Sequence, residues 1–410
     1  MGEAAADAPL ITTTTELEKF LAHVRDCGRV AFDTEFVSED TYEPVLCLVQ
    51  VATRDRLANI DPLSFRDLDA FWDVVTDPAV EVVMHAAGED LRICRLQTGK
   101  LPARVFDVQI AAGLVGFGFP LSLSNLAHQT LGVSLFGGET RTDWRRRPLS
   151  AAQLRYAVDD VRYLLPMADK IGGMLRELGR ESWAEEEFRD FLSTVQSRDN
   201  ESRWRRLPGL HQLSRRGLEA ARLLTEWRAE EARRQNRPLR QVIRDDLLVA
   251  IAKRQPSNRQ ELEALRDFNR PQLLSKSQDV LSRIGAAQAV PDHQLPEHGE
   301  RHEEGPGLTM MVNLLSATLA HCCSQKKIAV GMVGTASDLK EMIRWDALKR
   351  PESHRPHLAS GWRDGVCGET LLDVLAGRRS LRVIDPQSDV PVAVEPIADS
   401  NANPLFPRLE

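Results

Sequence analysis

The sequence predicts an α/β domain, built on a mixed β-sheet flanked by helices, followed by two small helical domains. Early in the chain, three short apolar runs come in succession, and helix and strand patterns then alternate, which is typical of a mixed sheet covered by helices. Beyond residue 210, apolar residues recur at helical spacing. Residues 286–307 contain three Pro, three Gly and many charges, and this composition indicates a flexible linker.

The elements of the α/β domain follow from local patterns. Thr15 and Glu18 suggest a capping box that opens a helix reaching about Arg25. The next three apolar runs have short connections, which favours antiparallel strands over residues 29–37, 46–53 and 56–60. The later elements alternate, and we expect helices over residues 65–75, 88–97, 107–115, 123–130 and 151–176, and strands over residues 80–85 and 104–106.

The second half of the chain reads as helical. Pro238 and Pro256 interrupt the helical patterns, so we expect helices over residues 213–235, 242–254, 258–267 and 272–284. The whole chain then divides into a disordered N-terminus (1–11), the α/β domain (12–180), a charged connector (181–209), a helical domain (210–285), the flexible linker (286–307), a second helical domain (308–380) and an irregular Pro-rich tail (381–410).

Composition bounds the class of protein. The chain has 42% hydrophobic residues and a net charge of −7, which argues against a generic nucleic-acid-binding protein, yet residues 201–245 hold twelve Arg against six Asp or Glu. The six cysteines lack the spacing of a zinc site and indicate a reducing compartment. No run approaches the roughly 20 apolar residues that span a bilayer, and the N-terminus has no basic region of a secretory signal. We expect a cytoplasmic protein without membrane contact, and we favour a monomer.

Three acidic segments point to a metal site. Asp33 and Glu35 interrupt an apolar strand two residues apart, so they face the same side, where two unpaired charges would be costly. A bound cation is the simplest compensation. Asp90 follows a strand and a turn, and Tyr156 and Asp160 are four residues apart on one face of a helix.

The residue types indicate which cation is bound. The candidate ligands Asp33, Glu35, Asp90 and Asp160 are all hard oxygen donors, and no Cys or His pair joins them. Such a set suits Mg²⁺ or Mn²⁺ rather than zinc. The helix that carries Tyr156 has its own start signal, because Ser150 and Gln153 form a capping box before it.

These segments together resemble the DEDD superfamily of 3′-5′ exonucleases. The motifs are Phe-Asp-Thr-Glu-Phe at 32–36, His-x-x-x-x-Asp-Leu at 85–91 and Tyr-Ala-x-x-Asp at 156–160. The tyrosine in the last motif marks the subgroup that is similar to ribonuclease D, and the run Arg-Thr-Asp-Trp-Arg-Arg-Arg-Pro-Leu-Ser at 141–150 agrees with it. The resemblance covers roughly residues 12–175.

The resemblance implies a fold and a mechanism. The fold is a ribonuclease-H-like sheet, and the site holds two divalent cations about 4 Å apart. Asp33 bridges both ions, and Tyr156 orients the attacking water. The products are nucleoside 5′-monophosphates, released one at a time from a 3′ end.

The helical regions add a second resemblance. The segments at 226–233 and 245–252 resemble the HRDC module, a small helical domain shared by RecQ-type helicases and ribonuclease D. Ser-Gly-Trp-Arg at 360–363 is similar to the end of a second HRDC-type domain. Two such domains favour RNA as the substrate and a bacterial protein.

Other polar residues near the motifs have ordinary structural interpretations. Asp159 is expected to face solvent because only Asp160 shares a helical face with Tyr156. His85 is expected to be a packed residue at a strand end, and Glu89 a solvated neighbour of Asp90.

Two basic segments are candidates for RNA contacts. Arg145, Arg146 and Arg147 precede the third motif and would contact phosphates, although such a run is usually a solvated face. The Arg-rich stretch 203–244 includes Trp204, Arg205 and Arg206 and could hold a strand through phosphate contacts and stacking. A helical bundle with core tryptophans and a solvated Arg face is an equal alternative.

The leading hypothesis is a metal-dependent 3′-5′ exoribonuclease that trims structured RNAs such as tRNA precursors. A DNA exonuclease of the same superfamily is the second hypothesis. A catalytically silent nucleic-acid adaptor is the third, and the four carboxylates with Tyr156 argue against it.

Overall fold

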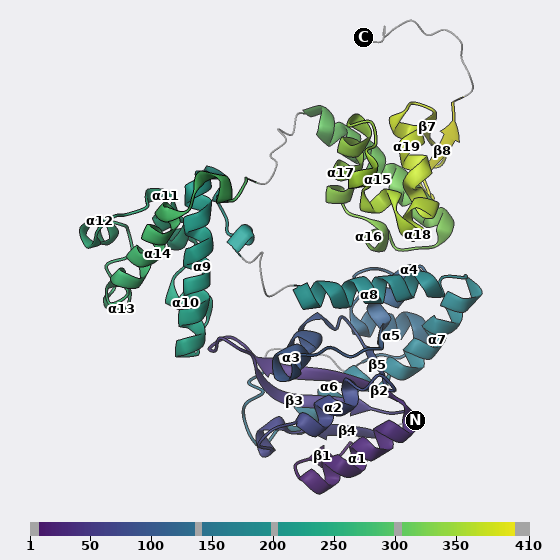
Figure 1. Ribbon diagram of the computed structural model, residues 1–410. Helices are drawn as coiled ribbons and strands as arrows, with labels where there is room; N and C mark the ends of the chain where they lie inside the picture. The colour runs from purple at the N-terminus through teal and green to yellow at the C-terminus, as the bar shows by residue number, and fades with distance from the viewer. Residues whose placement is uncertain (1–7, 136–141, 198–203, 299–305, 398–410) are drawn as a thin grey trace, which may run out of the picture.

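The computed structural model describes residues 8–135, 142–197, 204–298 and 306–397. The predictions made for residues 1–7, for part of the linker (299–305) and for the end of the tail (398–410) lie outside the described residues. Three units are seen in Figure 1: an α/β unit, a first helical unit beside it, and a second helical unit above it.

The α/β unit contains a six-stranded mixed sheet in the order β1-β4-β3-β2-β5-β6. Its strands are β1 (Leu10–Ile11), β2 (Arg29–Val37), β3 (Val45–Ala52), β4 (Leu57–Ile60), β5 (Glu81–Met84) and β6 (Val105–Asp107). Strands β2, β3 and β4 pair antiparallel, whereas β1 pairs parallel with β4, β5 with β2 and β6 with β5. The predicted mixed sheet and its three antiparallel strands are therefore confirmed.

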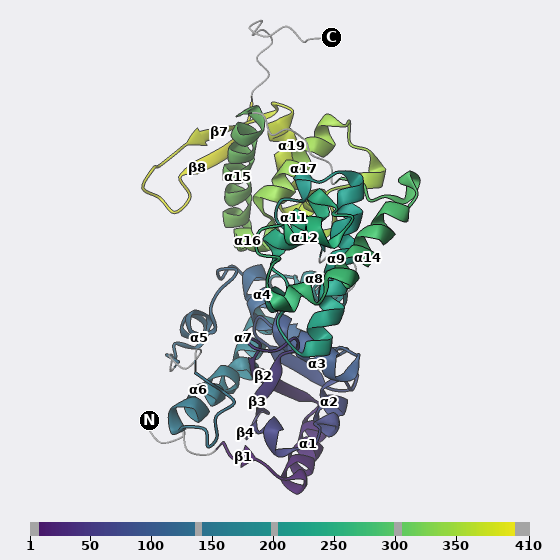
Figure 2. The ribbon, with the colours of Figure 1, turned by 90° about the vertical axis from the view of Figure 1, so that its left-hand side faces the viewer.

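Helices cover both faces of this sheet (Figures 1 and 2). One face packs against α1 (Thr14–Cys27), α2 (Asp69–Val75) and α3 (Gly88–Thr98). The other packs against α4 (Val108–Leu114), α5 (Leu123–Leu131), α6 (Ala151–Arg162) and α7 (Leu164–Glu177). Because side chains alternate along β2, Phe32 packs in the first core and Ala31 in the second.

The first helical unit has a core of its own. Its main helices are α9 (Arg215–Gln235), α11 (Asp245–Arg254) and α14 (Ser277–Ala289), and its shorter ones are α10 (Leu239–Val242), α12 (Arg259–Glu263) and α13 (Pro271–Leu274). The end of α9 touches the loop after β2, where the backbone N–H of Tyr42 donates to Asn236 Oδ1 over 3.2 Å and Arg233 lies 5.2 Å from the Tyr42 ring centroid.

The second helical unit packs onto the α/β unit through a shared core (Figure 2). It comprises α15 (Pro306–Lys326), α16 (Val330–Val333), α17 (Ala336–Ala347), α18 (Gly361–Arg363), α19 (Glu369–Leu375) and a hairpin of β7 (Arg379–Val383) and β8 (Val392–Pro396). Arg180 ties the units together by donating to the carbonyls of Leu114, Lys326 and Lys327. The hairpin replaces part of the predicted irregular tail.

By length and composition, the stretch Gly307–Lys326 of α15 could cross a membrane, although no such apolar run was expected from the sequence. In the structure this helix lies in the middle of the second helical unit, and Leu315, Leu319 and Cys323 are buried in the shared core. In total, 33% of this stretch is buried inside the protein.

Four predicted segments differ from the structure. The connector begins as helix α8 (Glu181–Ser197), whose apolar residues pack on the α/β unit. Residues 10–11 are not disordered, because β1 pairs with β4. The single helix expected over 151–176 is divided between α6 and α7 at Tyr163.

The fourth difference concerns the linker, whose first part is packed against α9. Arg216 donates to the carbonyls of Ala287, Gln288 and Val290, and Arg215 donates to that of Leu295. The start of α1 also lies two residues earlier than the predicted capping box, with Thr13 as the N-cap.

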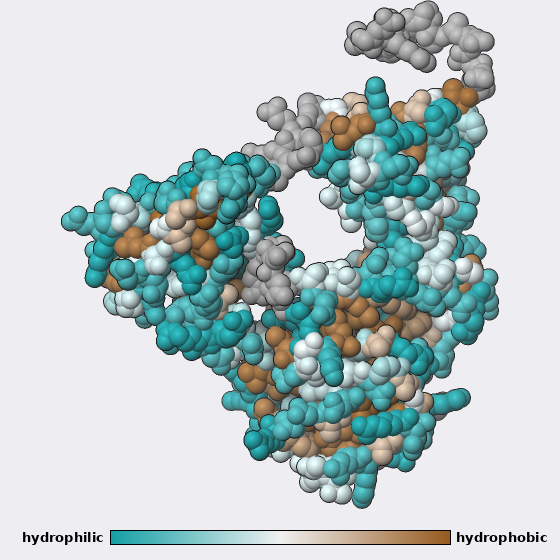
Figure 3. Space-filling model, viewed as in Figure 1, coloured by the Kyte–Doolittle hydropathy of each residue, from teal (hydrophilic) through white to brown (hydrophobic). Residues whose placement is uncertain are grey.

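Hydrophilic side chains cover most of the surface in view (Figure 3).

Candidate active site

Three of the predicted ligands meet between β2 and α6. Asp33 and Glu35 project from the same side of β2, toward the face that α6 covers. Asp160 lies in the last turn of α6, and one carboxylate oxygen of each of the three residues lies within 4.8 Å of the other two. The capping box of Ser150 and Gln153 starts this helix as predicted.

Asp90 approaches from α3, which covers the opposite face of the sheet. Its carboxylate is only 7% exposed, and Oδ1 accepts a hydrogen bond of 2.5 Å from the Thr34 hydroxyl. Thr34 points to the α3 side because it lies between Asp33 and Glu35 on β2. The charge of Asp90 nevertheless contributes to raising the pKa values of Asp33, Glu35 and Asp160, so the four carboxylates form one electrostatic unit, called the carboxylate cluster below.

Burial and mutual repulsion make this cluster hold protons when no cation is bound. Burial is the largest cause, and it raises the pKa of Glu35 to about 8, of Asp160 to about 7 and of Asp90 to about 6. The pKa of Asp33 is raised well above its ordinary value by burial and then by the charges of its three neighbours. Divalent cations would neutralise these charges, and the all-oxygen donor set fits Mg²⁺ or Mn²⁺.

Tyr156 is placed to act on the same cluster. It lies one helical turn before Asp160, and a hydrogen bond between its side chain and Asp160 counteracts part of the burial effect on the pKa of that carboxyl. Its ring packs against Trp144, with centroids 6.2 Å apart, in a small core with Cys47 and Leu48. This packing fixes the ring of Tyr156 on one side of α6, and its hydroxyl reaches Asp160.

Two positioning residues were missed by the sequence analysis. Thr34 was read only as part of a motif, although it holds Asp90. Asp107 is 1% exposed, and its carboxylate accepts hydrogen bonds from the backbone N–H groups of Ala86 (3.2 Å) and Ala87 (3.0 Å), in the turn before α3. It also caps α4, and an Asp at the first residue of the predicted helix was the available signal.

Three polar residues near the motifs, His85, Glu89 and Asp159, lie outside the carboxylate cluster. His85 is within 2.9 Å of the Leu121 carbonyl oxygen, and burial lowers its pKa. Glu89 pairs with Arg92 at 3.1 Å, and Asp159 lies 3.6 Å from Arg162.

The three consecutive arginines before α6 have different environments. Arg147 is used inside the protein: its guanidinium forms a bidentate pair with Asp61 (2.6 and 2.7 Å) and donates to the carbonyls of Cys47 and Trp144. The prediction that it contacts phosphate is therefore corrected, because the sequence did not show its partner 86 residues away. Arg145 and Arg146 are exposed, and Arg145 pairs with Asp143 and Asp40.

The second basic segment also contains both buried and exposed residues. Trp204 is 7% exposed and belongs to the core of the first helical unit, so the core alternative describes it and stacking on a base does not. Arg205 and Arg206 are exposed, and the Arg205 guanidinium lies 4.5 Å from the centroid of the Trp204 ring.

An open cleft lies between the α/β unit and the first helical unit, with a volume of about 960 Å³. Its charged lining contains five arginines and three glutamates, namely Arg92, Arg95, Arg205, Arg222, Arg233, Glu43, Glu219 and Glu226. The cleft borders the loop after β2, the strand that carries Asp33 and Glu35.

Comparison with known proteins shows which family this chain belongs to. The profile of a family described as 3′-5′ exonuclease matches residues 9–176, and the HRDC domain profile matches residues 218–284. Ribonuclease D from Gluconacetobacter diazotrophicus is 36% identical over 92% of this chain and 95% of its own length. Ribonuclease D from Escherichia coli K12 is 29% identical over 89% of this chain and 98% of its own.

Solved structures show the same relationship. The crystal structure of E. coli RNase D, described as an exoribonuclease involved in structured RNA processing, covers 90% of this chain and 99% of its own, with a TM-score of 0.77 and 29% identity. The catalytic core of RRP6 from Trypanosoma brucei shares the fold, with a TM-score of 0.54 over 70% of this chain and 82% of its own at 23% identity. Both sequence and fold place this chain in the ribonuclease D family, whose members are 3′-5′ exoribonucleases of the DEDD superfamily that depend on divalent metal ions.

Proposed function

We propose that this protein trims structured RNAs with a free 3′ end, such as tRNA precursors, by hydrolysis that uses two Mg²⁺ or Mn²⁺ ions. The carboxylate cluster carries this proposal. Ionised carboxylates that are buried together, as the raised pKa values indicate, are costly without a counter-charge. Their oxygen atoms are suitable ligands for hard divalent cations, which would supply that charge.

The residues divide the work in the following way. Asp33, whose pKa is raised by the charges of all three others, would hold the cations together with Glu35, Asp90 and Asp160. When bound, the cations supply an activated water and stabilise the leaving oxygen. Tyr156 orients that water by hydrogen bonding from its place beside Asp160. Thr34 and Asp107 keep Asp90 in position through the contacts described above.

The arginines suggest where the RNA lies. The cleft between the α/β unit and the first helical unit offers arginines for phosphate contacts, and Arg145 and Arg146 are exposed just before α6. We propose that the single-stranded 3′ end passes through this cleft to the carboxylate cluster. The second helical unit is proposed as an HRDC-type domain fixed to the α/β unit by the shared core.

The remaining expectations stand as proposals. A reducing compartment fits the cysteines, which are free in this structure and all buried except Cys27, and we propose a cytoplasmic location. We also propose that the protein acts as a monomer.

A gel time course on a 5′-labelled RNA with a short single-stranded 3′ tail tests the function. The reaction is run with Mg²⁺, Mn²⁺ or EDTA, beside the Asp33→Ala variant and a DNA oligomer of the same sequence. A metal-dependent ladder that shortens from the 3′ end of the RNA and is absent in the variant is expected. Preferential shortening of DNA would favour a DNA exonuclease, and binding without cleavage would favour an adaptor.

A further inference from the structure

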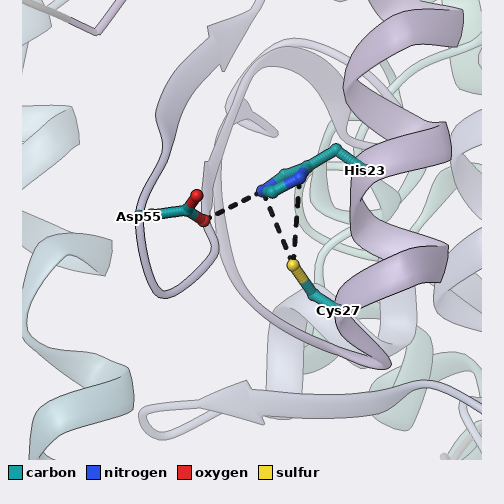
Figure 4. Close-up of side chains that lie close together, drawn as sticks. All are labelled: His23, Cys27 and Asp55. Atoms are coloured by element: carbon teal, nitrogen blue, oxygen red, sulfur yellow. Dashed lines mark hydrogen bonds and ion pairs between the residues drawn. The ribbon is translucent and has the colours of Figure 1, made fainter.

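Three side chains of types that bind metal ions meet on the α/β unit, outside the carboxylate cluster (Figure 4). His23 and Cys27 are four residues apart near the end of α1, so they share one face of the helix. Asp55 comes from the turn that joins β3 to β4. One donor atom of each residue lies within 4.8 Å of the other two.

The distances are close to those of a filled site. His23 Nε2 lies 3.0 Å from Asp55 Oδ1 and 3.5 Å from Cys27 Sγ. Zinc bonds of about 2.0–2.3 Å in a tetrahedron place the ligand atoms roughly 3.3–3.8 Å apart. Only small side-chain movements are therefore needed for the three residues to coordinate an ion.

We propose that His23, Cys27 and Asp55 form a binding site for a zinc-class divalent cation, with three protein ligands and a fourth position open to water. Thiolate and imidazole ligands select a borderline-soft cation, in contrast to the all-oxygen carboxylate cluster. The bound cation would tie the end of α1 to the β3–β4 turn. The cysteine spacing gave no signal of this site, because its ligands are one cysteine, one histidine four residues earlier and a distant aspartate.

A catalytic relay explains the cluster less well. A Cys-His-Asp relay uses the two ring nitrogens separately, one toward the thiol and the other toward the carboxylate. Here Nε2 is the nitrogen nearest to Cys27, and it is also the one that contacts Asp55 and, at 3.0 Å, Thr53 Oγ1. Because the thiol and the carboxylate both lie nearest to the same ring nitrogen, a shared metal ion fits the arrangement better than a relay.

The side chains have room to adjust. Cys27 Sγ lies at similar distances from both ring nitrogens, 3.5 and 3.9 Å, so it sits beside the imidazole ring rather than in line with Nε2. Cys27 is exposed and the Asp55 side chain is 65% exposed, so both can turn toward a common point in front of Nε2.

Binding is balanced by the release of one proton. Partial desolvation first, and then the charges of Asp55 and Asp26, raise the pKa of the exposed Cys27 thiol, so the free site holds a protonated sulfur. As the sulfur–metal bond forms, the thiol proton leaves to solvent.

Cobalt titration of the full-length protein tests the site. Co²⁺ bound to a thiolate absorbs in the near ultraviolet, whereas Co²⁺ held by the carboxylate cluster has only oxygen ligands. With excess Mg²⁺ added to fill the carboxylate cluster, we expect this absorption to saturate near one equivalent, to be abolished by Cys27→Ser, and to decrease when Zn²⁺ is added. The exposed His211 lies outside the cluster, and its substitution by Gln should leave the absorption unchanged. No thiolate absorption in the parent, or its persistence in Cys27→Ser, would overturn the proposal.

Calorimetric titration of Zn²⁺ in excess Mg²⁺ provides a second readout. Loss of one of three ligands should weaken Zn²⁺ binding by ~10-fold or more in His23→Gln and in Asp55→Asn. Circular dichroism shows whether each variant is folded. Folded variants that bind Zn²⁺ as tightly as the parent would contradict the assignment.

Discussion

The hydroxyl of Thr34 donates a hydrogen bond of 2.5 Å to Asp90 Oδ1, and this contact joins the central strand of the carboxylate cluster to helix α3. Burial raises the pKa of Asp90, and the bond from Thr34 opposes this effect, so that the pKa stands at about 6. A residue outside the proposed set of ligands thus influences the pH at which one of them is ionised.

We expect Thr34→Val to lower kcat/KM for RNA by ~10-fold at neutral pH, because Asp90 loses its partner and holds its proton more tightly. The Mg²⁺ concentration for half-maximal rate should rise, and the acid limb of the pH–rate profile should move to higher pH. Thr34→Ser keeps the hydroxyl and should resemble the parent. Equal pH profiles for the valine variant and the parent would remove Thr34 from the site.

The raised pKa of Glu35 predicts how stability depends on pH in EDTA. Folding moves this pKa from 4.5 to about 8, so the folded protein keeps a proton that the unfolded chain loses. The contribution is fully present below about pH 4.5 and is lost as the pH rises through about 8. The loss is on the order of 5 kcal/mol, and it should appear as a Tm that falls across this range.

Glu35→Gln removes this titration, so its Tm in EDTA should fall less between pH 5 and pH 9 than the Tm of the parent. Mg²⁺ should raise the Tm of the parent most at high pH, because it binds the ionised carboxylates. Differential scanning calorimetry measures both effects. A parent Tm that rises with pH over this range in EDTA would contradict the assigned pKa direction.

The sequence predicted the members of the carboxylate cluster more fully than it predicted the residues that hold them in position. Alternation along a strand put Asp33 beside Glu35, and helical spacing put Tyr156 beside Asp160, because both relations are local. Asp90 was identified through its motif, since its approach from the other face of the sheet depends on tertiary structure. The contacts of Thr34 and Asp107 join segments 56 and about 20 residues apart, and no local pattern encodes them.

Basic and aromatic residues were the hardest to interpret for the same reason. A surface arginine and one that pairs with a buried aspartate look alike in sequence, so Arg147 was grouped with Arg145 and Arg146. Trp204 was an open choice between stacking and core packing until its burial was known. Helix α8 was taken for a connector because its many charges concealed the apolar face that packs on the α/β unit.

The neighbouring residues Arg146 and Arg147 provide a matched test of this distinction. Arg147→Ala should destabilise the protein by about 3 kcal/mol, because it leaves Asp61, whose side chain is 5% exposed, without its partner. Arg146→Ala should leave the Tm unchanged, weaken RNA binding and reduce the slope of log K against log salt by about one unit. Calorimetry and fluorescence anisotropy separate the two outcomes, and an unchanged salt slope in folded Arg146→Ala would remove that phosphate contact.

The second helical unit should be held to the α/β unit by one buried ion pair. Arg363 donates to both carboxylate oxygens of Glu187 in α8 (2.6 and 2.9 Å), and Trp362 Nε1 donates to the same carboxylate over 2.9 Å. Glu187→Gln leaves the Arg363 charge without a counter-charge in an interior site, so we expect a loss of about 3 kcal/mol. Glu185→Gln changes an exposed residue of the same helix and should have no effect.

Limited proteolysis distinguishes loosening of this interface from unfolding of the whole chain. In Glu187→Gln, cleavage within α8 and within the second helical unit should become faster. The first helical unit has its own core and should stay protected from the protease. Replacing both partners, with Leu at 187 and Met at 363, should recover part of the loss, since no unpaired charge remains. If the single variant matches Glu185→Gln in Tm and cleavage rate, the ion pair does not hold the units together, and the apolar core shared by α4, α7 and α15 does so with the hydrogen bonds of Arg180.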